Sequence, residues 1–302
     1  MSLDRQKVRF DSGGETCVAW HYPGGRDACV IMAAGLGVTK EPGTDLFAAR
    51  FQRGGFHVLA FDYRRFGEST GQPRQVVRVA EQIADWSAAV TFAATLPGVD
   101  PRRLAAWGFS TSGGHVLRVA ARTPGLAAAI AQTPIADGTA TSRNASGYQS
   151  PAAMARVTAR ATADALGGLI GRPPRLMALD GPRGAVALLT TPDTADSERA
   201  LDPEGRHTDW PRTIAARAVL SLSFYRPGRD AARITCPLLV VVCDEDRSAP
   251  LAPTETVVRK APRGELVTLP GGHYAPFLDA HDKAAEAEID FLTRHLIGPA
   301  AA

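Results

Sequence analysis

RLAAWGFSTSGGH, residues 103–115, is an apolar run followed by a small-x-Ser-x-small turn and a segment that can begin a helix. A sharp strand-to-helix turn excludes large side chains two residues before and two residues after its serine, and Gly108 and Ser112 meet that demand. The pattern predicts an exposed nucleophile at Ser110. It also directs the backbone N–H of Thr111 into the same space, where it can stabilise negative charge. Ser112 fits a second small-x-Ser-x-small pattern and is the alternative nucleophile.

A second apolar run, at 237–243, ends in Asp244, Glu245 and Asp246, and Pro250 follows four residues later. A carboxylate at the C-terminal end of a parallel strand lies at the same sheet edge as the serine turn, where it can accept the Nδ1–H of a histidine. Asp246 is the preferred acid and Asp244 is the alternate. Glu245 is set aside because the alternation of a strand points it away.

The base is predicted from LPGGHY, residues 269–274, where His273 follows a predicted strand and two glycines. A glycine-flanked loop suits a base that carries a proton from the serine to a leaving group. Six other histidines are present, and His273 is distinguished by its position. The chain order Ser110, Asp246, His273, each after a predicted strand, matches a known type of serine triad.

Short apolar runs alternate with segments at helical spacing, which indicates βαβ units around a parallel sheet. We predict an α/β fold with a mostly parallel eight-stranded sheet and helices on both faces. The expected strands are 6–10, 16–22, 28–33, 57–62, 103–108, 127–132, 237–243 and 265–269. The first two form a hairpin across the turn at 11–14. Helices are expected at 75–96 and near the C-terminus, where Ala285, Ile289, Leu292 and Leu296 share a face.

Between the sixth and seventh strands the alternation breaks down over residues 137–230, a segment rich in Ala, Arg, Thr, Gly and Pro. It is too long for a structureless loop, so we predict a cap over a core made of residues 1–136 and 231–302. A helix at 151–166 and a hairpin turning at 180–184 are expected within it. Trp210, Phe224 and Tyr225 are the candidates for a substrate-binding wall.

The strand at 28–33 runs into Ala34-Gly35-Leu36-Gly37, where glycines let the backbone turn across the sheet edge. The Leu36 N–H can then supply a second oxyanion donor beside that of Thr111.

With DYRRFGES at 62–69 and the serine turn at 108–115, the chain resembles the α/β-hydrolase superfamily over nearly all of its length outside the cap. It is most similar to the branch of esterases, thioesterases and polyketide acyl-processing enzymes, some of which are acyltransferases. Ala34 replaces the histidine usual in that branch, and Ser112 departs from the general Gly-x-Ser-x-Gly pattern of the elbow. Within 62–69, an arginine and a carboxylate are expected to pair and brace the loop around the site.

The resulting expectation is a serine hydrolase that cleaves a carboxylic ester or thioester, with no cofactor and no metal. An acyltransferase or C–C bond hydrolase on the same triad is the first alternative. A non-catalytic binding protein on this scaffold is the second. The choice of substrate, the acyl chain length and the motion of the cap are not specified by the sequence.

Composition points to a soluble globule, since 45% of residues are apolar and 22% are charged. The net charge of +3 is spread among acids, so nucleic acid is not an expected partner. The N-terminal residues lack the apolar core of a signal peptide and no apolar run is long enough to cross a membrane, so a cytoplasmic location is expected. The four cysteines have no C-x-x-C spacing and are expected as free thiols. A homodimer is allowed but not specified.

Overall fold

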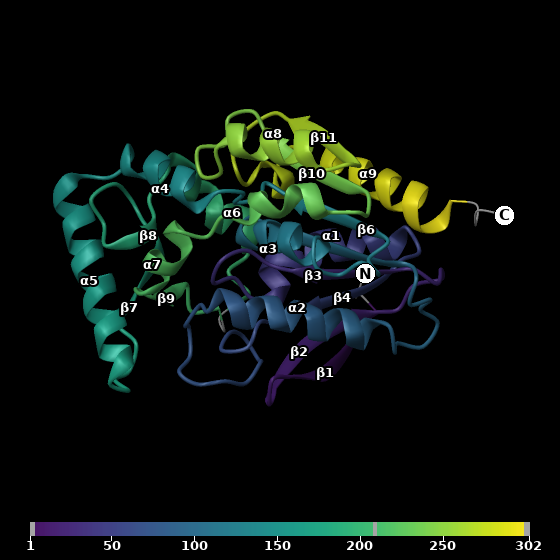
Figure 1. The fold of residues 1–302 in the computed structure, drawn as a ribbon, viewed down its shortest axis with the longest axis horizontal. Coiled ribbons are helices and arrows are strands. Elements are labelled where there is room, and N and C mark those ends of the chain that lie inside the picture. The colour runs from purple at the N-terminus through teal and green to yellow at the C-terminus, as the bar shows by residue number, and fades with distance from the viewer. Residues whose placement is uncertain (1–3, 208–209, 299–302) are drawn as a thin grey trace.

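The computed structural model describes residues 4–207 and 210–298. One large sheet carries helices on its two faces, and most of the elements of the insertion, residues 137–230, lie together at one end (Figure 1). The eight strands run in the order β1-β2-β4-β3-β5-β6-β10-β11. Their bounds are Gln6–Ser12 for β1, Glu15–Tyr22 for β2, Cys29–Ala33 for β3, His57–Phe61 for β4, Leu104–Phe109 for β5, Ala128–Gln132 for β6, Leu238–Cys243 for β10 and Gly264–Leu269 for β11.

Strand pairing confirms the mostly parallel eight-stranded sheet and the N-terminal hairpin. β1 and β2 pair antiparallel, as do β2 and β4, and every other pair of this sheet is parallel. The strands β3, β4, β5, β6 and β10 are buried at every residue. This is the pattern of parallel strands covered on both faces. Their carboxyl ends meet at one edge of the sheet, where the predicted site residues follow them.

The helices outside the insertion are α1 (Lys40–Arg53), α2 (Val79–Ala93), α3 (Thr111–Ala120), α8 (Leu251–Lys260) and α9 (His281–Leu292), with a short 3₁₀ helix η3 (Ala275–Phe277) and a final π-helical turn η4 (Thr293–Ile297). The expected helix at 75–96 begins later, at α2. Gln75 has a φ of 61°, its side chain donates to the Thr213 carbonyl and its own carbonyl accepts from the Ala215 N–H. Gln75 therefore bonds to the insertion, and the helix begins only at Val79.

The insertion contains three short strands and several helices. They are α4 (Gly138–Ser146), α5 (Pro151–Leu169), β7 (Leu176–Asp180), β8 (Ala187–Leu189), η1 (Pro192–Asp196), α6 (Ser197–Leu201), β9 (Thr213–Ala215) and α7 (Ala218–Ser223). The 3₁₀ helix η2 (Pro227–Arg233) spans the end of the insertion and packs on α3 and α8. The predicted helix at 151–166 is confirmed as α5, whose start is capped by the Ser150 side chain accepting from the Ala153 N–H.

The predicted hairpin at 180–184 is wrong. β7 pairs parallel with β8 and antiparallel with β9, so the strand after the turn does not run back along β7. A local turn is present, since the Ala185 N–H donates to the Pro182 carbonyl at 3.0 Å. The antiparallel partner of β7 lies more than thirty residues later, and a local turn pattern carries no information about it.

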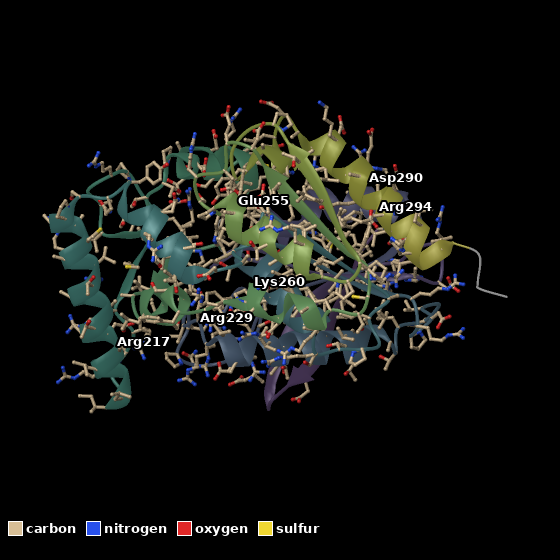
Figure 2. The ribbon with its side chains drawn as sticks, turned by 45° about the horizontal axis from the view of Figure 1, so that its top comes forward. Arg217, Arg229, Glu255, Lys260, Asp290 and Arg294 are labelled. Carbon is tan, nitrogen blue, oxygen red and sulfur yellow. The ribbon has the colours of Figure 1, made fainter. Side chains whose placement is uncertain are left out.

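Charged side chains of both signs project from the exterior, as Glu255 and Lys260 of α8, Asp290 of α9 and Arg294 of η4 illustrate (Figure 2). In the described residues, none of the helices has the length and apolar character needed to cross a bilayer. All four cysteines are buried and unpaired with one another, as expected of free thiols in a core.

Candidate active site

Ser110 lies between β5 and α3 in a strained backbone conformation, with a φ of 58° and a ψ of −117°. A positive φ in a non-glycine residue is uncommon and marks a turn that the surroundings enforce. A Cβ atom at Gly108 would lie 2.4 Å from the Ser112 carbonyl oxygen, so only glycine fits there. The elbow predicted from the sequence is therefore present, and it brings Ser110 to the carboxyl edge of the sheet.

The two candidate serines have different surroundings. The Oγ atom of Ser110 lies 3.0 Å from Nε2 of His273. Ser112 is 1% exposed, and its hydroxyl lies 2.6 Å from the Tyr63 hydroxyl and donates to the Ala34 carbonyl. The structure thus brings Ser110, and not Ser112, to the imidazole.

The imidazole of His273 connects Ser110 to Asp246. Its Nδ1 lies 2.8 Å from Oδ2 of Asp246, and the other carboxylate oxygen accepts from the N–H groups of Ser248 (2.8 Å) and Ala249 (2.7 Å). Because both oxygens of Asp246 have fixed partners, its orientation toward the histidine is determined by the loop after β10. His273 is 3% exposed, and Ser110 and Asp246 approach its two nitrogens.

Asp244, the alternate acid, has another role in the structure. Its Oδ1 accepts from the Gly271 N–H at 2.9 Å, on the loop that carries His273. Asp244 and Glu245 are both exposed, whereas Asp246 is buried. Asp244 therefore supports the histidine loop from outside.

A second carboxylate, that of Asp193 in η1, approaches the histidine loop from the insertion. Its Oδ2 accepts from the Arg247 N–H at 2.7 Å, and a Cβ atom at Gly272 would lie 2.6 Å from its Oδ1. Asp193 is 8% exposed. Sequence reasoning missed it because it follows no strand of the main sheet, although the absence of a side chain at Gly272 hinted at a close neighbour.

The charge balance around His273 favours its protonated form. Burial alone would lower the pKa of the imidazole, but the carboxylate of Asp246, through charge and hydrogen bonding, and the charge of Asp193 together raise the pKa above its ordinary value. For Asp193, burial and the neighbouring charge of Asp246 raise the pKa of the carboxyl.

Asp193→Asn is expected to move the acid limb of the kcat/KM profile to lower pH. A base must be neutral to accept a proton, so kcat/KM falls as the pH drops through the pKa of the free-enzyme histidine. Removing a nearby negative charge destabilises the imidazolium and lowers that pKa. A pH profile of kcat/KM measures the shift. Asp196→Asn is the control, because Asp196 belongs to the same short helix but has a side chain that is 50% exposed and pairs with Arg199. An acid limb that stays in place in Asp193→Asn would contradict the expectation.

A cavity of about 980 Å³, including its open mouth, lies beside Ser110 and His273. Most of its lining residues come from the insertion, and the majority are apolar, such as Leu179, Leu188 and Leu222. A mainly apolar cavity with a small number of polar groups in its lining is typical of a small-molecule site.

Of the three predicted wall residues, Trp210 and Tyr225 line this cavity. The expectation for Phe224 is wrong, because its side chain is 79% exposed and borders a shallow groove on another face. Tyr225 turns inward to reach Nδ1 of His115 at 2.8 Å, and the preceding residue consequently points out. Burial lowers the pKa of His115 to about 3, so this imidazole is a neutral hydrogen-bonding group.

The predicted oxyanion donors border the same space, since Leu36 and Thr111 line the cavity together with Ser110. Thr111 is the first residue of α3, so its N–H has no partner within the helix. Leu36 lies in the loop between β3 and α1, residues 34–39. A Cβ atom at Gly35 would lie 3.5 Å from Cβ of Ser110, which shows how closely this loop packs on the elbow.

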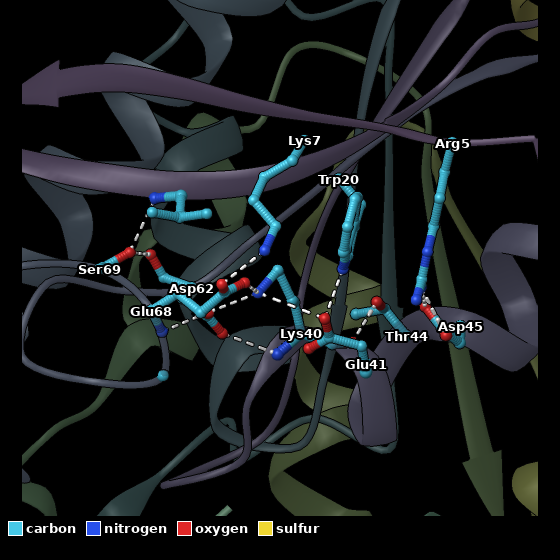
Figure 3. Close-up of polar contacts among 12 residues, drawn as sticks. Arg5, Lys7, Trp20, Lys40, Glu41, Thr44, Asp45, Asp62, Glu68 and Ser69 are labelled. Atoms are coloured by element: carbon cyan, nitrogen blue, oxygen red, sulfur yellow. Dashed lines mark hydrogen bonds and ion pairs between the residues drawn. The ribbon is translucent and has the colours of Figure 1, made fainter. Parts of the chain in front are cut away.

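Residues 62–69 brace the back of the site as expected, but Asp62 pairs with a lysine outside the motif. Nζ of Lys40 lies 2.9 Å from Asp62 and 2.7 Å from Glu68, and the Lys40 backbone N–H also donates to Asp62 at 2.8 Å (Figure 3). The two arginines pair with carboxylates of α2, Arg64 with Asp85 at 2.6 Å and Arg65 with Glu81 at 2.7 Å. The start of α1, and with it the 34–39 loop, is thereby tied to the end of β4.

Lys40→Met is expected to lower the free energy of unfolding by about 3 kcal/mol, because it leaves the buried carboxylate of Asp62 without its cation. Urea denaturation measures this difference. Lys7→Met is the matched control, since Nζ of Lys7 pairs with Glu68 where both side chains are about one-third exposed, and such a pair contributes about 1 kcal/mol or less. Equal losses of unfolding free energy in the two variants would show that the buried ion pair of Lys40 is no more stabilising than the exposed pair of Lys7.

Comparison with known proteins places this site within a known family. Residues 30–287 match the model of the alpha/beta hydrolase family. The quorum-quenching protein AidA of Acinetobacter baumannii (strain MDR-ZJ06) is 37% identical over 294 residues, which cover 95% of this chain and 94% of that protein. Polyketide transferase ATR5 of Stachybotrys chlorohalonatus (strain IBT 40285) is 32% identical over 184 residues, or 60% of this chain and 59% of its own.

Among solved structures, the alpha/beta hydrolase GrgF from Penicillium sp. sh18 superposes with a TM-score of 0.82 at 25% sequence identity, covering 98% of this chain and 100% of that one. The family match spans both the elbow and the loops that carry Asp246 and His273. This chain is an enzyme and belongs to the alpha/beta hydrolase family.

Proposed function

We propose that the chain is a serine hydrolase that cleaves a carboxylic ester or thioester through an acyl-enzyme intermediate. The observation that carries the proposal is the continuous contact from Ser110 Oγ to His273 Nε2 (3.0 Å) and from His273 Nδ1 to Asp246 (2.8 Å) beside an apolar cavity. This arrangement joins a nucleophile, a base and an orienting carboxylate within hydrogen-bond reach.

In the proposed mechanism, His273 takes the proton of the Ser110 hydroxyl as its oxygen attacks the substrate carbonyl carbon. The N–H groups of Leu36 and Thr111 stabilise the negative charge on the carbonyl oxygen, and Asp246 stabilises the imidazolium. Collapse of the intermediate breaks the bond to the leaving alcohol or thiol, which receives the proton from His273. Water, deprotonated in turn by His273, then attacks the acyl-enzyme and releases the acid.

The insertion is proposed to act as a cap, with residues 1–136 and 231–302 as the catalytic core. Support comes from the cavity, most of whose lining belongs to residues 137–230. Its apolar wall suits an acyl chain better than a charged substrate, because burying an unpaired charge there is costly.

The test is a screen of p-nitrophenyl esters and acyl thioesters of increasing chain length. We expect saturable release of the free acid, with kcat/KM rising with chain length until the cavity is filled. Absence of turnover with every ester and thioester would contradict the proposal. The relative AidA, which matches 95% of this chain, is named a quorum-quenching protein, so quorum-sensing signal molecules are a second set of substrates for the same assay.

Acyl transfer is the second candidate, and the similarity to a polyketide transferase favours testing it. It shares every step up to the acyl-enzyme and differs in whether water or another nucleophile attacks it. Product analysis with an added alcohol or amine separates the two, because a transferase forms the new ester or amide in preference to the free acid.

A further inference from the structure

The loop that carries Leu36 is held by hydrogen bonds at two carbonyl groups, one on each side of that residue. The Ala34 carbonyl accepts from the Ser112 hydroxyl, and the Gly37 carbonyl accepts from Nε1 of Trp210 at 2.8 Å. Within the loop, the Val38 N–H donates to the Gly35 carbonyl at 3.2 Å and closes a tight turn. The peptide that presents the Leu36 N–H therefore lies between two anchored points.

The hydrogen bond from Ser112 to Ala34 is the last in a buried series of three. The number of protons on each group determines which group donates. The Ala34 carbonyl can only accept, so the single proton of Ser112 is used there, and Ser112 must accept from Tyr63 at 2.6 Å. The proton of Tyr63 is then used as well, and its oxygen accepts from Nε1 of Trp86 at 2.7 Å. Tyr63, Ser112 and Trp86 are 5%, 1% and 0% exposed, so water does not compete for these bonds.

This series of hydrogen bonds also explains how the elbow accommodates a serine at position 112. The atom of Ser112 that crowds Gly108 is its backbone carbonyl oxygen, whereas its side chain points to Ala34. The extra hydroxyl therefore does not widen the turn at Ser110. It links the helix that follows the nucleophile to the strand end on which the oxyanion loop begins.

The second anchor comes from the insertion. Trp210 is 5% exposed, one face of its indole borders the cavity, and Arg212 lies over the ring with its guanidinium carbon 5.4 Å from the ring centroid. The insertion therefore contacts the catalytic core at the backbone of the oxyanion loop itself, and not solely through the cavity wall.

We propose that Ser112 and Trp210 are positioning residues that hold the Leu36 N–H toward the oxyanion, one from the elbow helix and one from the insertion. The inference rests on the proposed function, in which that N–H stabilises the tetrahedral intermediate. Donors of an oxyanion hole are effective because they are oriented before the charge develops. Loosening either anchor should weaken binding of the transition state while leaving binding of the substrate nearly unchanged.

The test compares Ser112→Ala and Trp210→Phe with the unmodified protein on one p-nitrophenyl ester. We expect each variant to lower kcat about 10-fold with KM changed less than twofold, since removing one oxyanion donor completely costs about 10²- to 10³-fold. The inhibition constant of an acyl trifluoromethyl ketone, which forms an oxyanion on Ser110, should rise in proportion to the loss in kcat. That of the corresponding unreactive alkyl amide should not change.

Two controls separate positioning from general damage. Ser12→Ala removes another buried serine hydroxyl, which donates to Asp85 at 2.7 Å, and Trp107→Phe removes a buried indole N–H, which donates to Glu288 at 2.9 Å. Both should lower Tm without altering the ratio of the two inhibition constants. If Ser112→Ala unfolds, Trp210→Phe still tests the opposite anchor.

The inference is overturned if both variants keep the kcat and the ketone affinity of the unmodified protein, or if their losses lie in KM alone. Its failure is distinguishable from that of the proposed function. An active Ser110→Ala variant would contradict the proposed function. If Ser110→Ala is inactive while Ser112→Ala and Trp210→Phe are fully active, the positioning role alone is contradicted.

Discussion

Ser110→Ala is expected to lower kcat by about 10⁶-fold, because the nucleophile of a serine triad cannot be replaced by its partners. The side chain is small and its neighbours on β5 and α3 are unaffected, so the strained turn and the cavity should persist. A fluorophosphonate that labels one serine per chain in the unmodified protein should give no labelled species in this variant. Intact-protein mass spectrometry and initial rates measure the two effects.

Ser112→Ala is the matched comparison, since it removes a hydroxyl two residues away while retaining the contact between Ser110 and His273. This variant should still be labelled to one equivalent, and its kcat should fall only about 10-fold, against about 10⁶-fold for Ser110→Ala. The opposite result, labelling of Ser110→Ala but not of Ser112→Ala, would assign the nucleophile to the second serine and contradict the present interpretation of the elbow.

Asp246→Asn is expected to lower kcat by about 10⁴-fold, the loss typical of a triad whose histidine takes the wrong tautomer. The asparagine oxygen would keep the N–H groups of Ser248 and Ala249, so its amide would face the histidine with a donor. Nδ1 of His273 must then accept, and the ring proton moves to Nε2. A nitrogen that carries a proton cannot take one from Ser110.

Asp244→Asn provides the control for that loss, because the asparagine oxygen can still accept from the Gly271 N–H. We expect kcat within about twofold of the unmodified protein, as is usual for an exposed substitution that retains its hydrogen bond. A 10⁴-fold loss in Asp244→Asn with little effect in Asp246→Asn would exchange the two assignments. Steady-state rates at a pH well above the acid limb avoid confusion with protonation of His273.

The central sheet could be predicted because five of its strands are buried along their whole length and therefore appear as uninterrupted apolar runs. Ser110, Asp246 and His273 could be found for a related reason. Ser110 follows β5 and Asp246 follows β10, two of these runs, and His273 follows the partly exposed parallel strand β11. Parallel strands bring their carboxyl ends to one edge whatever the distance along the chain.

The insertion was harder to interpret because its structure depends on contacts that no local pattern encodes. β7 finds its antiparallel partner in β9, and Gln75 leaves its expected helix to bond to the same strand. The outward turn of Phe224 follows from the hydrogen bond that draws Tyr225 to His115. Asp193 reaches the histidine loop from a short 3₁₀ helix, a position with no signal in the spacing of charged residues.

Three hydrogen-bond contacts join the insertion to Arg247 and Ser248, in the loop that carries Asp246. Asp193 accepts from the Arg247 N–H, Asn144 donates to the Arg247 carbonyl, and the hydroxyls of Thr191 and Ser248 lie 2.6 Å apart. The insertion, which supplies most of the cavity lining, is thus also a neighbour of the loop that carries Asp246. Replacing the insertion with that of a relative would therefore change the pH optimum together with the range of substrates. Selection on one of these properties would also change the other.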